Sequence, residues 1–263
     1  MGLKRIHVVG CRRSGTTLLA EMLGNCFAID GRIDHEQSLW KPIREHRDKH
    51  ILLTKKPPDT LHMAGVLRFD PELHVIAMVR DPRAAITSSH KFYKLPDAYF
   101  TSFWRWEAYM LAIRKLAQHP RYLVVRYEEL VRQPDQVQAR IAEHFPFLRQ
   151  TGLFSRFPEG ATVHVTAQQS MNGLREPDPH SLEKWRQHLP RIKGEWLQNP
   201  QLSEWLIAEG YEVDRSWEAA LDDVEPFFGD YKNVRPHMGR RLETFIRYHW
   251  HTLVYLMRRR LRI

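Results

Sequence analysis

The segment 10–19, GCRRSGTTLL, combines two glycines with arginines and hydroxyl side chains, a set suited to binding an anion. Gly10 and Gly15 have the spacing of the Walker A pattern, in which the second glycine is followed by Lys and then Ser or Thr. Here Thr16 and Thr17 follow instead, so the lysine that holds a nucleoside triphosphate is missing. Backbone N–H groups at a helix N-terminus attract anions, and arginine can donate two hydrogen bonds to a phosphate or sulfate. The residues expected to bind an anion here are Arg12, Arg13, Ser14, Gly15, Thr16 and Thr17.

A second group of candidates lies in residues 79–90, VRDPRAAITSSH, after a strongly apolar run. We expect Arg80 at the carboxyl end of a strand, where ligand crevices of α/β proteins form. Ser88 follows on a helix predicted to begin at Pro82, with Asp81 as its N-cap, so Arg80 and Ser88 can hold one phosphate. Taken alone, the pattern also fits an Arg80–Asp81 surface pair and a serine-rich helix end. The glycine loop favours the anion site.

The elements that position these residues alternate between strands and helices. Short apolar runs typical of strands occur at residues 5–9, 50–54, 73–79 and 121–127. Helical patterns separate them, at residues 82–90, 97–118 and 134–145. This alternation predicts an α/β fold, a parallel β-sheet flanked by helices and similar to that of P-loop nucleotide hydrolases.

The second half of the chain lacks strand patterns and contains helical ones, at residues 181–190, at 199–209 and from about residue 236. No linker composition separates it from the first half. We therefore expect a single domain over residues 1–263, in which 1–150 form a nucleotide-binding α/β core. Residues 151–263 form a mostly helical cap and end in a basic helix.

The composition narrows the ligand class and the location. The net charge is +9, which suits an anionic ligand, a nucleic acid or an anionic membrane. The basic residues are scattered outside the C-terminal segment, so we expect no nucleic acid partner. Two cysteines, an N-terminal apolar run too short for a signal peptide and the lack of about 20 consecutive apolar residues indicate a cytoplasmic protein.

The C-terminal segment 245–263, FIRYHWHTLVYLMRRRLRI, mixes aromatic and basic residues. A basic amphipathic helix can lie on an anionic membrane, which would make the protein membrane-associated through peripheral contact. It can equally pack on the core and leave a solvated end. Both alternatives stay open at this point.

The two anion-binding segments, in this order, resemble those of the sulfotransferase family that uses 3′-phosphoadenosine 5′-phosphosulfate (PAPS). The segments VVRYEELVRQPDQV and SLEKWRQHL also resemble parts of this family, so the resemblance runs from about residue 5 to residue 190. It implies that the glycine loop binds the 5′-phosphosulfate and that Arg80 and Ser88 bind the 3′-phosphate. It also implies PAPS as co-substrate, 3′-phosphoadenosine 5′-phosphate (PAP) as product, and no metal.

The resemblance assigns further roles. Arg13 is expected to stabilise charge on the bridging oxygen as the sulfuryl group leaves, and PAPS has no γ-phosphate for the missing lysine to hold. In RIDHEQSLW, residues 32–40, Glu36 is the first candidate for the base and His35 the second. TKKPP resembles a Lys-x-Pro segment of carbohydrate sulfotransferases and favours Lys55 over Lys56 beside the transferred group.

Late contacts to the 3′-phosphate are also expected. Arg175 is the candidate in NGLREPDPHSLEKW, and Lys184 and Arg186 are weaker alternatives. Each of the three also fits a solvated surface charge.

The expected function is transfer of a sulfuryl group from PAPS to an acceptor hydroxyl of a small molecule or glycan, including a carbohydrate or glycolipid. One rival is a P-loop small-molecule kinase that uses Asp81 to bind magnesium, although the missing lysine counts against it. Another is a non-catalytic nucleotide-binding protein of the same fold.

Overall fold

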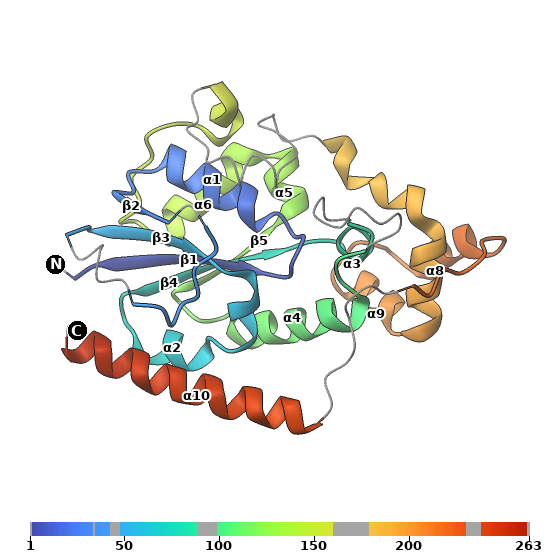
Figure 1. Ribbon diagram of the computed structural model, residues 1–263. Helices are drawn as coiled ribbons and strands as arrows, with labels where there is room; N and C mark the ends of the chain where they lie inside the picture. Colours follow the sequence, from blue (N-terminus) through green and yellow to red (C-terminus); the bar gives the residue numbers. More distant parts are fainter. Residues whose placement is uncertain are drawn as a thin grey trace.

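A parallel five-stranded sheet forms the centre of the computed structural model (Figure 1), which describes residues 2–33, 35–42, 48–88, 99–159, 179–229 and 238–261. The strand order is β2-β3-β1-β4-β5, and every neighbouring pair is parallel. The strands are β1 (Lys4–Gly10), β2 (Gly31–Arg32), β3 (Ile51–Lys55), β4 (Leu73–Val79) and β5 (Tyr122–Arg126). All their carboxyl ends therefore meet at one edge of the sheet.

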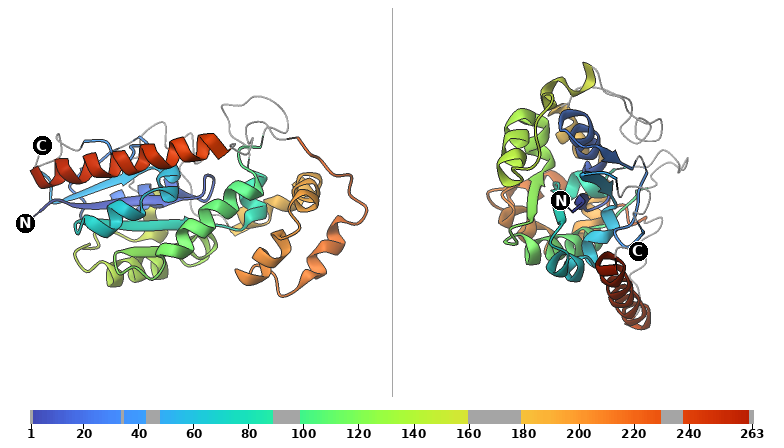
Figure 2. Two further views of the ribbon diagram at one scale, coloured as in Figure 1. Left: turned by 90° about the horizontal axis from the view of Figure 1, so that it is seen from below. Right: turned by 90° about the vertical axis from the view of Figure 1, so that its left-hand side faces the viewer.

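Helices cover both faces of the sheet, as Figures 1 and 2 show. One face is covered by α1 (Thr16–Cys26), α5 (Tyr127–Arg132) and α6 (Pro134–His144). The other is covered by α2 (Ala64–Phe69) and α4 (Phe103–Leu116), with α3 (Pro82–Ile86) at the carboxyl edge. The described residues of the C-terminal part also form α8 (Leu189–Gln198), α9 (Leu202–Ala208) and α10 (Met238–Leu261). This confirms the predicted fold class of a parallel sheet flanked by helices, with a helical C-terminal part.

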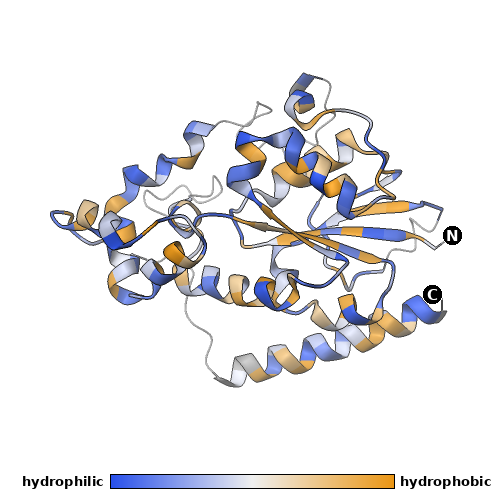
Figure 3. Ribbon diagram, turned by 180° about the vertical axis from the view of Figure 1, so that it is seen from behind, coloured by the Kyte–Doolittle hydropathy of each residue, from blue (hydrophilic) through white to orange (hydrophobic). Residues whose placement is uncertain are grey.

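Residues of β4 alternate between two hydrophobic cores because neighbouring side chains on a strand point to opposite faces. Val75 and Ala77 join the core on the side of α2 and α4. Ile76 and Met78 join the core under α1 and α6. Figure 3 accordingly shows a hydrophobic sheet centre between helices with hydrophilic outer faces. The apolar run at residues 73–79 thus predicted this strand correctly, and the structure buries it on both faces.

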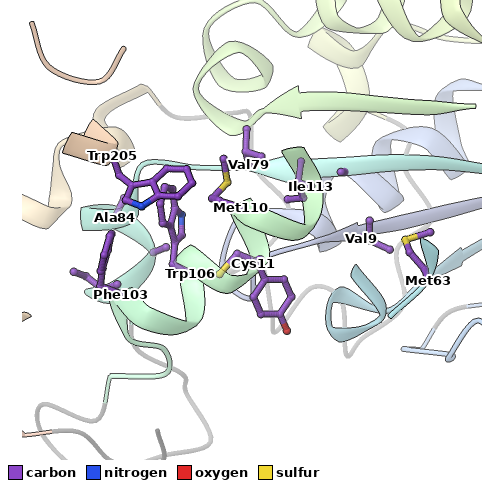
Figure 4. Packing of buried hydrophobic residues seen from close by; sticks show 14 of the residues in the cluster. Val9, Cys11, Met63, Val79, Ala84, Phe103, Trp106, Met110, Ile113 and Trp205 are labelled. Carbon is purple, nitrogen blue, oxygen red and sulfur yellow. The ribbon is translucent and has the colours of Figure 1, made fainter. Parts of the chain in front are cut away.

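An aromatic cluster lies beside the carboxyl end of β4 (Figure 4). Phe103 and Trp106 of α4 stack with ring centroids 5.7 Å apart, and Trp205 of α9 meets Trp106 edge-on at 5.5 Å. The indole N–H of Trp106 donates to the carbonyl oxygen of Arg80 at 2.9 Å. The core therefore fixes the backbone of Arg80.

The structure corrects several predicted boundaries. Strand β2 was not predicted, because two residues are too few to show a periodicity. Helix α3 ends at Ile86 instead of continuing to residue 90: Thr87 is its C-cap, and the Ser88 N–H donates to Ala85 O in a tighter turn. Ser88 therefore follows the helix instead of lying on it. In the cap, the expected helix at 181–190 is mostly 3-10 helix, in Pro179–Leu182 and Lys184–His188.

Candidate functional site

The candidate residues come from three neighbouring strands at the carboxyl edge of the sheet. Gly10 ends β1 and begins the glycine loop, Lys55 ends β3, and Arg80 follows β4 directly. β1 lies between β3 and β4 in the sheet, so segments far apart in sequence converge on one loop.

The glycine loop, residues 10–15, is a tight turn in which two positions, Gly10 and Gly15, have no room for a larger side chain. Gly10 and Gly15 have φ angles of 140° and 88°. A Cβ atom at Gly10 would overlap Met78 O, and one at Gly15 would overlap the Tyr127 ring. The Gly10 N–H donates to Thr60 Oγ1 at 2.9 Å, and the buried Ser14 hydroxyl donates to Cys11 O. The loop is thus held rigidly at the N-terminus of α1.

Arg13 has left-handed backbone conformation, with a φ of 69°, unlike any other non-glycine residue in the described ranges. This conformation costs an ordinary residue about 1–2 kcal/mol, and such strain often accompanies a functional site. Arg13 Nε donates to Ser88 Oγ at 2.8 Å, and Arg80 Nη1 donates to Arg13 O at 3.0 Å. The structure therefore brings the two predicted anion-binding segments into direct contact.

Arg13 and Arg80 bring two positive charges close together, and Arg80 also acts on the buried Glu128 carboxyl, whose pKa burial raises and the charge of Arg80 lowers in part. Within the described part of the chain, neither guanidinium forms an ion pair with a carboxylate, and the buried Nε of Arg80 has no hydrogen-bond partner. Burial lowers the pKa of Arg13, and the positive charge of Arg80 lowers it further. The Arg80 guanidinium lies 4.2 Å from the centroid of the Tyr127 ring, which supports it from one side. Such an arrangement suits a bound anion.

Lys55 brings a further cation to the first turn of α1. Its Nζ donates to Thr17 Oγ1 at 2.7 Å, beside the buried Thr16. Burial lowers the pKa of Lys55, while the charge of Glu36 raises it in part. Thr16 stands where the Walker pattern has its lysine, but a lysine from β3, Lys55, reaches the same helix N-terminus.

The candidates for the base lie beside the end of β3. The Gln37 N–H donates to Lys55 O at 3.0 Å, which anchors residues 35–37 there. Glu36 Oε2 lies 2.9 Å from Lys56 Nζ, and its side chain is 45% exposed, so an acceptor can reach it. His35 is exposed. The structure thus places Glu36 near both lysines, with Lys56 as its ion-pair partner.

The remaining candidates are placed differently. The Arg12 guanidinium lies 5.2 Å from the centroid of the Phe100 ring, and the Phe100 N–H donates to Ser88 O at 3.3 Å. Arg186 pairs with Glu183 on the surface, the solvated role that was its alternative. Arg175 lies outside the described residues, so its predicted contact has no structural description.

A buried polar network under the site was missed by the sequence reasoning. His7 Nδ1 lies 2.8 Å from Thr54 Oγ1, and His7 Nε2 lies 3.2 Å from Asp59 Oδ2. Asp59 Oδ2 also accepts from the Leu39 N–H at 2.5 Å, which fixes the segment after Glu36 to the sheet. Burial lowers the pKa of His7 and favours its neutral form. The sequence did contain a sign of this network, since Arg5 and His7 place polar side chains on one face of an apolar strand.

Residues 32–147 match the model of the sulfotransferase family, a stretch that contains Arg80 and Ser88 but not the glycine loop. Comparison with curated proteins gives no significant match.

A solved structure shares the fold, and two others show a weaker similarity. The sulfotransferase domain of the Synechococcus PCC 7002 olefin synthase is 17% identical, with a TM-score of 0.52 over 70% of this chain and 88% of that domain. The sulfotransferase domain of the curacin biosynthetic pathway is 16% identical, with a TM-score of 0.49 over 70% and 90%. Retinol dehydratase, in complex with androsterone and PAP, is 14% identical with a TM-score of 0.41 over 89% and 85%, too low for its ligands to carry over. Residues 32–147 are thus similar to the sulfotransferase family, and the chain shares the fold of a sulfotransferase domain.

Proposed function

We propose that the protein transfers a sulfuryl group from PAPS to an acceptor hydroxyl, on a carbohydrate or glycolipid. The observation that carries the proposal is the bridge through Arg13, which joins the glycine loop to Arg80 and Ser88 without a carboxylate partner in the described ranges. A nucleotide with phosphate groups at both its 3′ and 5′ positions matches two adjoining clusters of donors. PAPS, when bound, supplies the activated sulfuryl group.

Each donor has a separate task in this proposal. Arg80 offers its unpartnered Nε to the 3′-phosphate, and Ser88, which accepts a hydrogen bond from Arg13, still has its own hydroxyl hydrogen to donate. The glycine loop, the first turn of α1 and Lys55 hold the 5′ end. At the 5′ end, the N-terminus of α1 and Lys55 thus take the place of the Walker lysine.

The transfer itself needs charge stabilisation and a base. Arg13 and Lys55 stabilise the negative charge that remains on the phosphate of the product, a type of contact worth about 3–4 kcal/mol in the barrier. Glu36 accepts the proton of the attacking hydroxyl. Lys56, its ion-pair partner, keeps Glu36 beside the end of β3.

The kinase alternative finds less support in the geometry. Asp81, its candidate magnesium ligand, accepts the Arg83 backbone N–H at 2.7 Å as the N-cap of α3. Its other oxygen lies 2.8 Å from Arg83 Nη2 in a buried ion pair. Binding magnesium would require Asp81 to give up both contacts.

Calorimetry with PAP and with ATP plus magnesium tests the proposal. We expect tight PAP binding and weak ATP binding, and Arg80→Ala should weaken PAP binding at least about tenfold because a charged hydrogen-bond donor is lost. The matched control is Arg140→Ala, which removes an exposed arginine paired with Glu129. ATP binding as tight as PAP binding, or equal effects of the two substitutions, would refute the assignment.

A further inference from the structure

Helix α10 runs along the outside of the α2 and α4 layer, as Figures 1 and 2 show, and one of its faces packs on the protein. The Tyr248 ring stacks on His62 with centroids 3.9 Å apart, and Tyr255 OH donates to Asp70 Oδ2 at 2.5 Å. Thr252 Oγ1 accepts from the Trp40 indole N–H at 3.1 Å. The expectation that this helix packs on the core therefore holds for this face.

The opposite face of α10 is apolar and exposed. At 3.6 residues per turn, five large side chains fall within an arc of about 80°, roughly opposite Tyr248, Thr252 and Tyr255. Each is 52% to 61% exposed, and together we call them the apolar stripe: Leu242, Ile246, Trp250, Leu253 and Met257. Soluble proteins seldom leave a continuous apolar surface of this kind without a partner.

The charges of α10 indicate which partner the apolar stripe meets. The helix sequence has six arginines and one acidic residue, Glu243, and one of the arginines, Arg259, pairs with Asp70 on the packed face. Arg247, Arg258 and Arg260 are exposed. No helix in the described part of the chain is long and apolar enough to cross a membrane.

We propose that α10 lies flat on an anionic lipid bilayer, with the apolar stripe in the headgroup region and the exposed arginines, Arg247, Arg258 and Arg260, on the lipid phosphates. Basic amphipathic helices with Trp and Leu on the apolar face bind membranes in this way. A second copy of the chain fits less well, because a twofold interface brings identical surfaces together. Two arginine-rich helices would then face each other, whereas anionic lipid neutralises them.

Vesicle co-sedimentation of the full chain tests this proposal independently of the transfer chemistry. We expect binding to vesicles of phosphatidylcholine mixed with phosphatidylglycerol, weak binding to phosphatidylcholine alone, and loss of binding at high salt. The double variant Trp250→Glu/Leu253→Glu should bind at least about a hundredfold more weakly. Arg247→Ala/Arg258→Ala should bind about thirtyfold more weakly while keeping the apolar stripe.

The control is Leu111→Glu, which places the same charge at a similarly exposed apolar position on α4. It should leave vesicle binding unchanged, and all variants should unfold at the wild-type temperature because the substituted side chains are exposed. Equal binding to both lipid compositions, or stripe variants that bind like the wild type, would overturn the proposal. A dimer interface would also overturn it. In that case light scattering would show a wild-type dimer and a monomeric Trp250→Glu/Leu253→Glu variant, and the two would bind vesicles equally.

Discussion

Substitution of Lys55, the cation at the end of β3, tests the proposed site directly. Lys55→Met removes the charge and keeps an unbranched side chain of similar length. A unit charge about 4 Å from a phosphate is worth about 4 kcal/mol at the effective dielectric constant of a protein surface, and part of this offsets the lost hydration of the ammonium group. We therefore expect PAP affinity to fall about tenfold to a hundredfold. Turnover should fall about a hundredfold to a thousandfold, as when one preorganised donor is lost.

The lowered pKa of Lys55 adds a second signature. Burial lowers this pKa, so the free protein loses the proton at a lower pH than an unfolded chain does. A bound anion favours the charged form, so PAP binding should take up a proton at alkaline pH and weaken as the pH rises through the lowered pKa. Calorimetry in alkaline buffers of different ionisation enthalpy measures this uptake. Lys55→Arg should abolish it, because the guanidinium stays charged.

The same shift sets the sign of the effect on stability. Between the lowered pKa of Lys55 and its ordinary value, the unfolded chain binds more protons, so the free energy of unfolding rises with pH. At neutral pH the buried charge is destabilising, so Lys55→Met should raise the melting temperature while it weakens PAP binding.

Two results would refute this reasoning about Lys55. One is an unchanged PAP affinity in Lys55→Met, and the other is the same alkaline profile in Lys55→Arg as in the wild type. The matched control is Lys56→Met, since Lys56 pairs with Glu36 and not with the first turn of α1. Its PAP affinity should stay within about twofold of the wild type.

Three further predictions follow from other parts of the structure. Glu36→Gln should keep PAP affinity and lower turnover, measured as PAP release with an active acceptor, about a hundredfold or more; undiminished turnover would exclude Glu36 as the base. Arg83→Ala should lower the free energy of unfolding in denaturant titrations by about 3–5 kcal/mol, because it leaves Asp81 and Glu212 without their buried partner; a change below about 1 kcal/mol would contradict this. Since the pKa of His7 is lowered by burial, the unfolded chain binds more protons below pH about 6.5. Stability should therefore fall as the pH drops through that value, and His7→Asn should flatten the dependence of melting temperature on pH.

Much of the fold could be predicted because it depends on local patterns. The run at residues 73–79 is long and apolar enough to identify β4, and Pro134 correctly marks the start of α6. The resemblance in the glycine loop and the Arg80 segment pointed to the same family whose model residues 32–147 match. The type and bounds of the helices in the cap were harder to predict, because a 3-10 helix such as Lys184–His188 has the composition of an α-helix.

The detailed site could not be predicted, because it depends on contacts between distant segments. Arg13 reaches Ser88 from a left-handed backbone conformation, and no pattern in the sequence predicts this conformation for an arginine. The sequence also does not show that Tyr127 lies both against Gly15 and under Arg80. Tyr127 was expected only to close a strand, whereas the structure makes it the support of a candidate ligand-binding arginine. The roles of these residues stay predictions until binding is measured.

The sheet order explains how the site can lack the Walker lysine and still hold an anion. In a parallel sheet, the carboxyl ends of neighbouring strands lie about 4.8 Å apart, so a long side chain from one strand can reach the loop after the next. Lys55 does this from β3, and Arg80 does it from β4 on the other side of β1. A lysine within the loop supplies charge at one point, whereas these two side chains place cations on both sides of it. That arrangement suits a ligand with two separated anionic groups better than one with a single chain of phosphates.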